Sequence, residues 1–254
     1  MMRLEKLENR VAILYIDNPP LNVLTLEMTQ EIIRLMDQIE VDDQIRALII
    51  TGAGERAFCA GADINEFVAV RDQVIEKKLR DENKALLKIE KLSKPVIAAL
   101  NGFTLGGGCE IALACDIRIL ANNVKIGLPE INLGVFPGSG GIYRLPRIVG
   151  MSRALELVYT GDLINAETAL RMGLVNQITE PDKTIAIAIE LAEKIALKPK
   201  KSLAAIKYGI RRSLEIPIEQ AIEHTLELSD EVFKTEDCQE GIDAFFEKRS
   251  PRFK

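Results

Sequence analysis

Glu110 and Glu130 are ionisable residues among apolar neighbours, a placement that a charged side chain does not take without a reason. Glu110 lies in the run Cys109–Ala114, and Glu130, 20 positions further on, lies between Pro129 and Ile131. Burying a carboxylate without a partner costs on the order of several kcal/mol. Two carboxyl groups in one apolar site could move protons at the α and β carbons of an activated acyl group.

The residues alone leave other interpretations of these glutamates open. Glu110 could point to the solvent side of its helix or pair with a buried cation such as Arg118. Glu130 could be an unrelated surface glutamate. Only a fold that brings both carboxyl groups to one site would favour proton transfer.

Three consecutive glycines precede the first of these glutamates. Gly106, Gly107 and Gly108 end a strand-loop unit and lead into an apolar helical run, so their amides would lie at a helix N-terminus. Amides in that position, free of Cβ atoms and reinforced by the helix dipole, suit a negatively charged oxygen. A tight turn for close packing is the alternative interpretation of the same glycines.

Two other glycine motifs match known signatures only in part. Gly52–Ala57 follows an expected strand and fits the dinucleotide fingerprint, with Asp72 lying 20 residues after its first glycine. The segment Arg56–Asp63 nevertheless interrupts the helix that should begin there, so an NAD-dependent oxidoreductase is a weak alternative. Gly138–Gly140 resembles a nucleophile elbow, but Pro137 stands where that motif requires a glycine.

Composition excludes several mechanisms. The 254 residues include 33 Lys and Arg against 38 Asp and Glu, a formal net charge of −5 that disfavours phosphate-backbone binding. The single histidine, His224, lies in a charged helical pattern, so multi-histidine metal sites are excluded. The four cysteines contain no CxxC pair and indicate a reduced, intracellular protein. Carboxylates, amides or backbone groups must therefore carry any chemistry.

We also expect a soluble, cytoplasmic protein. The most apolar stretch, Val96–Ala114, contains Asn101, four glycines and Glu110, which a membrane-spanning helix would tolerate poorly. The segment Met1–Arg10 carries charges of both signs and lacks the apolar run of a secretory signal.

The elements that must position these residues alternate between strand and helix, which indicates an α/β fold. Short β-branched runs predict strands at Val11–Ile16, Ile45–Thr51, Val96–Leu100, Ile117–Ala121 and Leu174–Ile178. Apolar stripes predict helices over Leu26–Ile39 and Asp72–Leu92, and a short helix led by Asn165 and ending at Gly173. After Pro181 only helical patterns remain: Lys183–Leu197, Lys200–Leu214, Ile218–Phe233 and Cys238–Lys248.

Seven ordered motifs together resemble the enoyl-CoA hydratase/isomerase (crotonase) superfamily over nearly the whole chain. They are Arg56–Asp63, Lys94–Gly102 leading into the glycine triplet, Gly127–Glu130, Pro137–Gly141, Thr160–Asp162, Gly173–Val175 and Phe246–Arg249. The resemblance implies a crotonase-like spiral of ββα repeats over residues 1–195. It also implies a C-terminal helical region, residues 196–254, that forms a homotrimer or a homohexamer.

The same resemblance assigns roles to the candidate residues. The amides of Ala62 and Gly107 match the oxyanion hole that holds the thioester oxygen. Glu110 matches the residue that orients and deprotonates the water adding at Cβ, and Glu130 matches the donor of the proton at Cα. Further contacts to substrate and CoA are implied for Ala60, Gly61, Asp63, Ile64, Gly106, Gly138, Phe245 and Lys248. No metal or redox cofactor is implied, because CoA is part of the substrate.

Retention of both glutamates favours hydration of a 2-trans-enoyl-CoA to a 3-hydroxyacyl-CoA, in fatty-acid or related acyl-CoA degradation. Isomerases of the superfamily commonly keep only the second glutamate. Leu128 replaces a glutamine found in many hydratases, and Pro19–Leu21 lacks a lysine that some members use near the CoA phosphates. An enoyl-CoA isomerase, a hydratase for branched or dienoyl acyl-CoA, and a non-enzymatic acyl-CoA- or RNA-binding scaffold remain alternatives.

Overall fold

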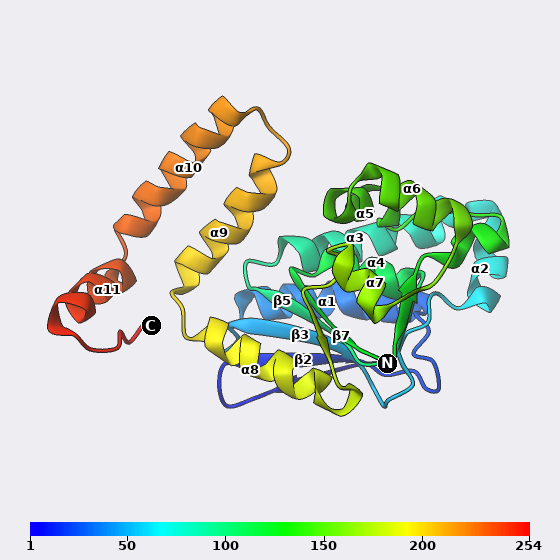
Figure 1. The fold of residues 1–254 in the computed structure, drawn as a ribbon, viewed down its shortest axis with the longest axis horizontal. Coiled ribbons are helices and arrows are strands. Elements are labelled where there is room, and N and C mark those ends of the chain that lie inside the picture. The colour runs from blue at the N-terminus through cyan, green and yellow to red at the C-terminus, as the bar shows by residue number, and fades with distance from the viewer.

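The computed structural model describes residues 1–254 and contains two β-sheets surrounded by helices (Figure 1). The larger sheet has the order β1-β2-β3-β5-β7-β10, and the smaller has the order β4-β6-β8-β9. The larger sheet consists of β1 (Met2–Lys6), β2 (Val11–Ile16), β3 (Ala47–Gly52), β5 (Val96–Leu100), β7 (Ile117–Ala121) and β10 (Gln177–Thr179). The smaller sheet consists of β4 (Ala57–Cys59), β6 (Phe103–Leu105), β8 (Lys125–Gly127) and β9 (Ile164–Asn165).

From β3 to β8, consecutive strands alternate between the two sheets, which builds a spiral. β3, β5 and β7 are parallel in the larger sheet, and each is followed by a strand of the smaller sheet, namely β4, β6 and β8. β4, β6 and β8 are also parallel to one another. A helical segment follows each strand pair, so the predicted ββα spiral is confirmed.

Helices cover both faces of the larger sheet because its strands are apolar on both sides. On one face, alternate residues such as Leu48 and Ile50 pack against α1 (Leu26–Val41), α3 (Arg80–Lys91) and α4 (Gly107–Ala114). On the other face, Val11, Ile13, Ala47 and Ile49 pack against the alanines of α8 (Thr184–Ala196). The remaining α-helices of the core are α2 (Ile64–Val70), α5 (Gly141–Val149), α6 (Met151–Thr160) and α7 (Ala166–Arg171).

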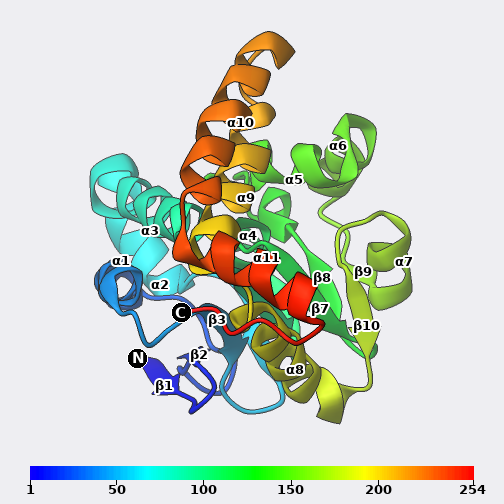
Figure 2. The same ribbon diagram turned by 90° about the vertical axis from the view of Figure 1, so that its left-hand side faces the viewer.

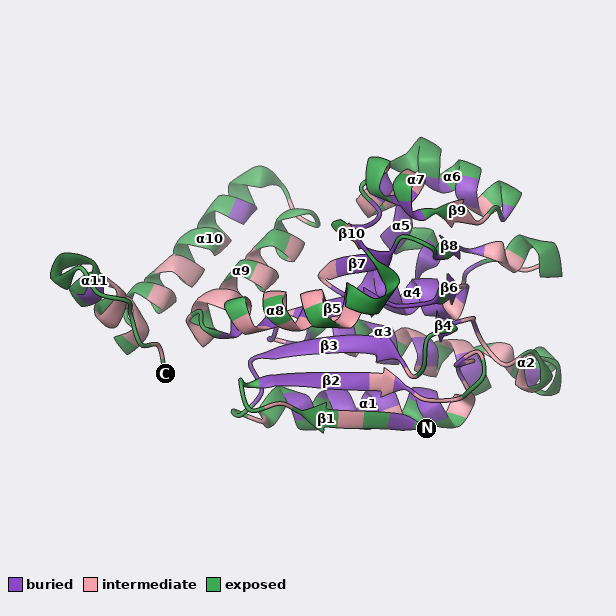
Figure 3. Cartoon of the chain, turned by 60° about the horizontal axis from the view of Figure 1, so that its bottom comes forward, coloured by how far each residue is buried: buried purple, intermediate pink, exposed green.

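Three C-terminal helices extend away from this core (Figures 1 and 2). They are α9 (Lys200–Ser213), α10 (Ile218–Phe233) and α11 (Glu236–Glu247). Pro199 and Pro217 precede the first residues of α9 and α10, as their positions predict. Figure 3 shows how much more of these helices is exposed than of the sheets. The division at residues 195 and 196 into a core and an oligomerisation region stays a prediction.

The strands predicted from long apolar runs are present, but the last strand of the larger sheet differs from its prediction. β2, β5 and β7 begin and end as predicted, and the strand predicted at Leu174–Ile178 is confined to Gln177–Thr179. Leu174 and Val175 are buried in a turn, where the Leu174 carbonyl accepts a hydrogen bond from Arg118 Nε at 2.7 Å. Apolar character there reflects burial and not strand pairing.

The helix predicted over Asp72–Leu92 is divided into three segments. A 3₁₀ turn (Arg71–Gln73) and a π-helical turn (Ile75–Leu79) precede α3. Helices α2, α5 and α6 and the short strands β1, β4, β6, β8 and β9 are not among the predicted elements. No helix combines the length and the hydropathy needed to cross a bilayer.

Candidate active site

A cavity of about 570 Å³ lies where three strands of the smaller sheet end. Its walls include Ala60–Ala62 after β4, Gly106 and Gly107 after β6, and Pro129 and Glu130 after β8. Because β4, β6 and β8 are parallel, their carboxyl ends meet at one edge of the sheet (Figure 3). The fold therefore brings together segments that are up to 70 residues apart in the chain.

Two backbone amides lie close together at this edge. The backbone of Leu24 pairs with the loop after β4. The Leu24 amide donates to the Gly61 carbonyl at 2.8 Å, and the Leu24 carbonyl accepts from the Asp63 amide at 3.0 Å. The Ala62 amide takes part in neither bond. Gly107 is the first residue of α4, where amides lack a partner within the helix, and a Cβ on Gly107 would lie 3.7 Å from the Ala62 nitrogen. Amides without a partner within the chain can donate to a ligand, and the oxyanion hole assigned to Ala62 and Gly107 stays a prediction.

Glu110 points into the same cavity from the first turn of α4. Its side chain is only 4% exposed, and Oε1 accepts hydrogen bonds from the amides of Ser139 and Gly141, each at 2.9 Å. Arg118 instead bonds to the carbonyls of Ala112, Cys115 and Leu174. Glu110 thus neither faces solvent nor pairs with Arg118, and both alternative interpretations of this residue are wrong.

Glu130 approaches the cavity from the 3₁₀ turn Pro129–Leu133. Its Oε2 atom is buried without a hydrogen-bond partner within the chain. Its Oε1 atom lies against Gly106, whose left-handed φ of 52° brings the backbone close to this carboxyl group. A buried carboxyl oxygen without a partner is available to a ligand or to water.

Burial alters the acidity of both carboxyl groups. Desolvation raises the pKa of Glu110 from 4.5 to about 7, an effect that the Gly141 amide opposes and the charge of Glu130 reinforces. Desolvation also raises the pKa of Glu130 from 4.5 to about 6. Near neutral pH the pair can therefore hold one proton and one negative charge, which is the state that can both accept and donate a proton.

Three polar side chains beside Glu110 are missing from the sequence-based site. Lys78 and Glu82 form a buried ion pair, with side chains 4% and 7% exposed, and Ser139 Oγ donates to Glu82 Oε2 at 2.5 Å. All three residues line the cavity. The only signal in the sequence is the spacing of four between opposite charges, which usually marks an exposed helix face.

The cavity contains most of the residues assigned by resemblance. Its walls include Ala60, Gly61, Ala62, Ile64, Gly106, Gly107, Glu110, Glu130 and Gly138. Asp63 lies next to this wall, and its carboxylate caps α2 by accepting from the Asn65 amide at 2.8 Å. Phe245 and Lys248 lie at the end of α11, and the cavity of the same chain does not include them.

The two partial motifs have structural explanations. β3 ends at Gly52 and β4 begins at Ala57, so no helix starts at the glycine fingerprint, and the dinucleotide-site alternative is wrong. A Cβ on Gly52 would lie 2.1 Å from the Ala57 carbonyl, which explains this glycine by close packing. Ser139 occupies the loop before α5 and bonds to Glu82, so it forms no elbow between a strand and a helix.

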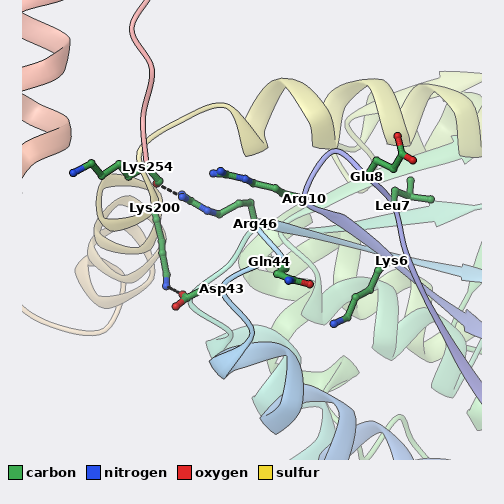
Figure 4. Close-up of a pocket in the computed structure, with 9 residues that line it drawn as sticks. All are labelled: Lys6, Leu7, Glu8, Arg10, Asp43, Gln44, Arg46, Lys200 and Lys254. Carbon is green, nitrogen blue, oxygen red and sulfur yellow. Dashed lines mark hydrogen bonds and ion pairs between the residues drawn. The ribbon is translucent and has the colours of Figure 1, made fainter.

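A second and larger cavity, of about 670 Å³, shares no lining residue with the cavity that contains Glu110 and Glu130 (Figure 4). It is bounded by the turn before β2 and the loop before β3, at strand ends opposite to the carboxyl edge. Its walls are Lys6, Leu7, Glu8, Arg10, Asp43, Gln44, Arg46, Lys200 and Lys254. Lys200 pairs with Asp43, and Arg46 donates to the Lys254 carbonyl. None of the predicted site residues lines it.

Comparison with known proteins agrees with this geometry. The family model described as Enoyl-CoA hydratase/isomerase matches residues 6–254. A short-chain-enoyl-CoA hydratase of Clostridium acetobutylicum is 43% identical over 247 residues, which cover 97% of this chain and 94% of that protein. A crotonyl-CoA hydratase of Syntrophomonas wolfei is 40% identical, with 98% and 96% of the two chains covered.

The fold is also similar to that of a solved structure. The crystal structure of an enoyl-CoA hydratase from Bacillus anthracis matches with a TM-score of 0.96 at 36% identity, covering 100% of this chain and 98% of that one. The predicted fold class is thereby confirmed. The family match, the near-complete relatives and the fold lead to one conclusion: this chain belongs to the enoyl-CoA hydratase/isomerase family.

Proposed function

We propose that this protein is an enoyl-CoA hydratase, which adds water reversibly to the double bond of a 2-trans-enoyl-CoA to give a 3-hydroxyacyl-CoA. The observation that carries the proposal is the meeting of Glu110, Glu130 and the amides of Ala62 and Gly107 in one cavity. In the superfamily that this chain resembles, enzymes that keep only the second glutamate are commonly isomerases. Here Glu110 is buried, Glu130 is half-buried with its Oε2 atom buried, and each carboxyl group has an oxygen free of hydrogen bonds within the chain.

The geometry supports a division of labour among these groups. The thioester oxygen lies between the amides of Ala62 and Gly107, which stabilise the negative charge that develops on it. Glu110 accepts a proton from water as the water oxygen bonds to Cβ. The electron pair of the double bond forms the enolate, and Cα then takes the proton that Glu130 donates. The proton taken by Glu110 and the proton given by Glu130 leave the enzyme's total charge unchanged.

The acidities of the two glutamates set a condition on this cycle. Glu110 has the higher pKa, about 7 against about 6 for Glu130, so a single shared proton resides mainly on Glu110. Hydration needs the proton on Glu130. We propose that the bound water, held between both carboxyl groups, exchanges the proton between them when the acyl group enters.

We propose short acyl chains as substrates, within fatty-acid or related acyl-CoA degradation. A cavity of about 570 Å³ must hold the thioester and the reacting water besides the acyl group. The relatives with the printed names short-chain-enoyl-CoA hydratase and crotonyl-CoA hydratase support the same size class. The charged pair Lys78 and Glu82 in the cavity wall is a poor neighbour for a long alkyl chain.

The test is hydration of crotonyl-CoA, followed by the loss of absorbance of the conjugated thioester. We expect turnover by the wild-type protein and a fall in kcat of roughly 10²–10⁴-fold for Glu110→Gln and for Glu130→Gln. Glu156→Gln, at an exposed position of α6, is the matched control and should keep wild-type kcat. Full activity of either active-site variant would contradict the two-carboxylate mechanism.

We also propose that the reaction needs no metal or redox cofactor. Two carboxyl groups and two amides supply the proton transfers and the charge stabilisation that hydration requires. Dialysis against EDTA should therefore leave kcat and KM unchanged. A loss of activity that zinc or magnesium restores would contradict this part of the proposal.

We propose a homotrimer, or a homohexamer of two trimers, built through the C-terminal helices. α9, α10 and α11 expose many large apolar side chains, including Ile206, Ile210, Leu214, Ile218, Ile222, Leu226, Phe233, Phe245 and Phe246. Exposed apolar faces of this extent mark protein interfaces. Phe245 and Lys248 can contact CoA in such an assembly if α11 of one copy lies beside the cavity of another. Light scattering after size-exclusion chromatography gives the subunit number, and a monomer would contradict the proposal.

A further inference from the structure

A continuous chain of buried polar contacts leads from Lys78 and Glu82 to Glu110. The π-helical turn Ile75–Leu79 supplies Lys78, and the first turn of α3 supplies Glu82, with only 3% and 6% of the two residues exposed. Lysine and glutamate are rarely buried this deeply unless they are paired, and here they pair with each other. π-helical turns occur frequently at functional sites.

The pair connects to Glu110 through Ser139. Ser139 Oγ donates to Glu82 Oε2 at 2.5 Å, while the amide of the same residue donates to Glu110 Oε1 at 2.9 Å. The Ser139 carbonyl accepts from Arg144 Nη1 at 3.3 Å, and Arg144 in turn pairs with Glu90 at 2.6 Å. Ion pairs on both sides therefore hold the loop whose amides bind Glu110.

We propose that Glu82, together with Lys78 and Ser139, is a positioning residue for Glu110: it fixes the loop amides that hold this carboxyl group and places a negative charge beside it. The inference rests on the proposed hydratase function, in which Glu110 is the base. Glu82 accepts bonds from Lys78 and from Ser139, so its two oxygens are already occupied within the protein. It therefore acts through Glu110 and not on the substrate directly.

The charges around Glu110 show why Glu82 has an electrostatic effect. Glu130 faces it from the 3₁₀ turn, Glu82 and Lys78 face it from the α3 segment, and Arg144 reaches the same loop from α5. On α4 itself, burial raises the pKa of the Cys109 thiol, so this neighbour is neutral. After desolvation and the opposing Gly141 bond, the charges of Glu130 and then Glu82 contribute to the raised pKa of Glu110.

The sign of the effect follows from these charges. Glu82→Gln removes a negative charge and leaves Lys78 without its partner, and each change favours the ionised form of Glu110. Because Glu110 has the higher pKa of the two carboxyl groups, the pH at which kcat/KM falls on the alkaline side should move down, by roughly half a unit or more. Looser positioning of Glu110 should lower kcat between about tenfold and about a hundredfold, with little change in KM.

Two further variants separate charge from hydrogen bonding. Ser139→Ala keeps the Glu82 charge and the backbone amide, so kcat should fall while the alkaline limb stays where it is in the wild type. The double variant Lys78→Met with Glu82→Gln removes the pair without leaving an unpartnered lysine, and its alkaline limb should lie at or above that of Glu82→Gln but below that of the wild type. Asp230→Asn, in the exposed pair with Lys234 on α10, is the control and should alter neither kcat nor the limb.

The outcomes divide clearly. Thermal unfolding establishes that each variant is folded before kinetics are compared. A fall in kcat with an unmoved alkaline limb in Glu82→Gln would reduce Glu82 to a structural role and overturn the proposal, as would a change confined to KM. If the wild type hydrates no enoyl-CoA, the proposed function fails separately. Titration of the Glu110 carboxyl by carbon-13 NMR in wild type and Glu82→Gln would then still measure the effect of Glu82, and equal titration curves would overturn it.

Discussion

The carboxyl group of Glu130 lies directly against Gly106, so closely that a Cβ on Gly106 would stand 3.2 Å from Oε1. The glycine has a left-handed φ of 52°, which an L-residue adopts only with strain. Space at this position thus determines where the second carboxyl group can lie. The relationship joins the glycine triplet after β6 to the 3₁₀ turn after β8, and it leads to a direct test.

Gly106→Ala should displace Glu130 and lower kcat by at least about tenfold, because a small misplacement of a catalytic group is costly. Gly173→Ala is the matched control, since Gly173 has a comparable left-handed φ of 76° but no atom within 4 Å of the added methyl group. Both variants should lose similar stability by thermal unfolding, and only Gly106→Ala should lose turnover. Equal kcat values in the two variants would show that Glu130 tolerates displacement.

The pH dependence of kcat/KM should be bell-shaped. This parameter reports the free enzyme, in which the pKa of Glu130 is about 6 and that of Glu110 is about 7. As the pH falls below about 6 both carboxyl groups become protonated and the base is lost. As it rises above about 7 both become ionised and the acid is lost. Initial rates across pH 5 to 9, in buffers of constant ionic strength, measure the profile, and a plateau reaching pH 9 would contradict a need for a protonated carboxyl group.

Replacing Glu110 should stabilise the protein at alkaline pH. Below the ordinary carboxyl pKa of 4.5, Glu110 is protonated in both the folded and the unfolded chain, so burial costs little. Between 4.5 and about 7 the unfolded chain ionises first, and the wild type loses stability as the pH rises. Glu110→Gln lacks this loss while its side-chain oxygen can still accept from Ser139 and Gly141. At pH 8 we expect it to be more stable by roughly 1–3 kcal/mol.

Thermal unfolding of both proteins at pH 5 and pH 8 checks this expectation. The difference in melting temperature should be larger at pH 8 and should favour the variant. A variant that is less stable than the wild type at pH 8 would show that the buried charge is compensated by contacts beyond the two amides. The expected result is the familiar exchange of stability for activity at a functional site.

The sequence predicts the larger sheet better than the smaller one, for a physical reason. β2 and β5 are runs of six and five apolar residues, β7 has four apolar residues besides Arg118, and this composition identifies the three strands. β4, β6 and β8 have three residues each and exist because they pair with one another across long separations in the chain. A three-residue segment carries no recognisable period, so only the fold reveals it.

The residues of the site also differ in how well the sequence predicts them. Glu110 and the glycine triplet stand out because a charge and three flexible residues interrupt an apolar run, and the ordered motifs identify the family. The sequence does not identify Lys78 and Glu82 as site residues, because a charged pair four residues apart normally lies on a solvated helix face. Here the π-helical turn before α3 turns that face towards the cavity, and no local pattern in the sequence marks this change.

Adjacent glycines of the triplet should respond differently to the same substitution. A Cβ on Gly108 would lie 2.1 Å from the Cys59 carbonyl, so Gly108→Ala should separate α4 from β4 and destabilise the protein by about 3 kcal/mol. A Cβ on Gly107 would meet the Ala62 nitrogen at 3.7 Å, an ordinary contact, so Gly107→Ala should keep the fold. Its methyl group would nevertheless lie beside the amide that we propose holds the thioester oxygen, and kcat should fall by roughly 10²-fold. Thermal unfolding and hydration rates, measured on both variants, distinguish the packing glycine from the catalytic one; a fully active Gly107→Ala would show that the thioester oxygen lies elsewhere.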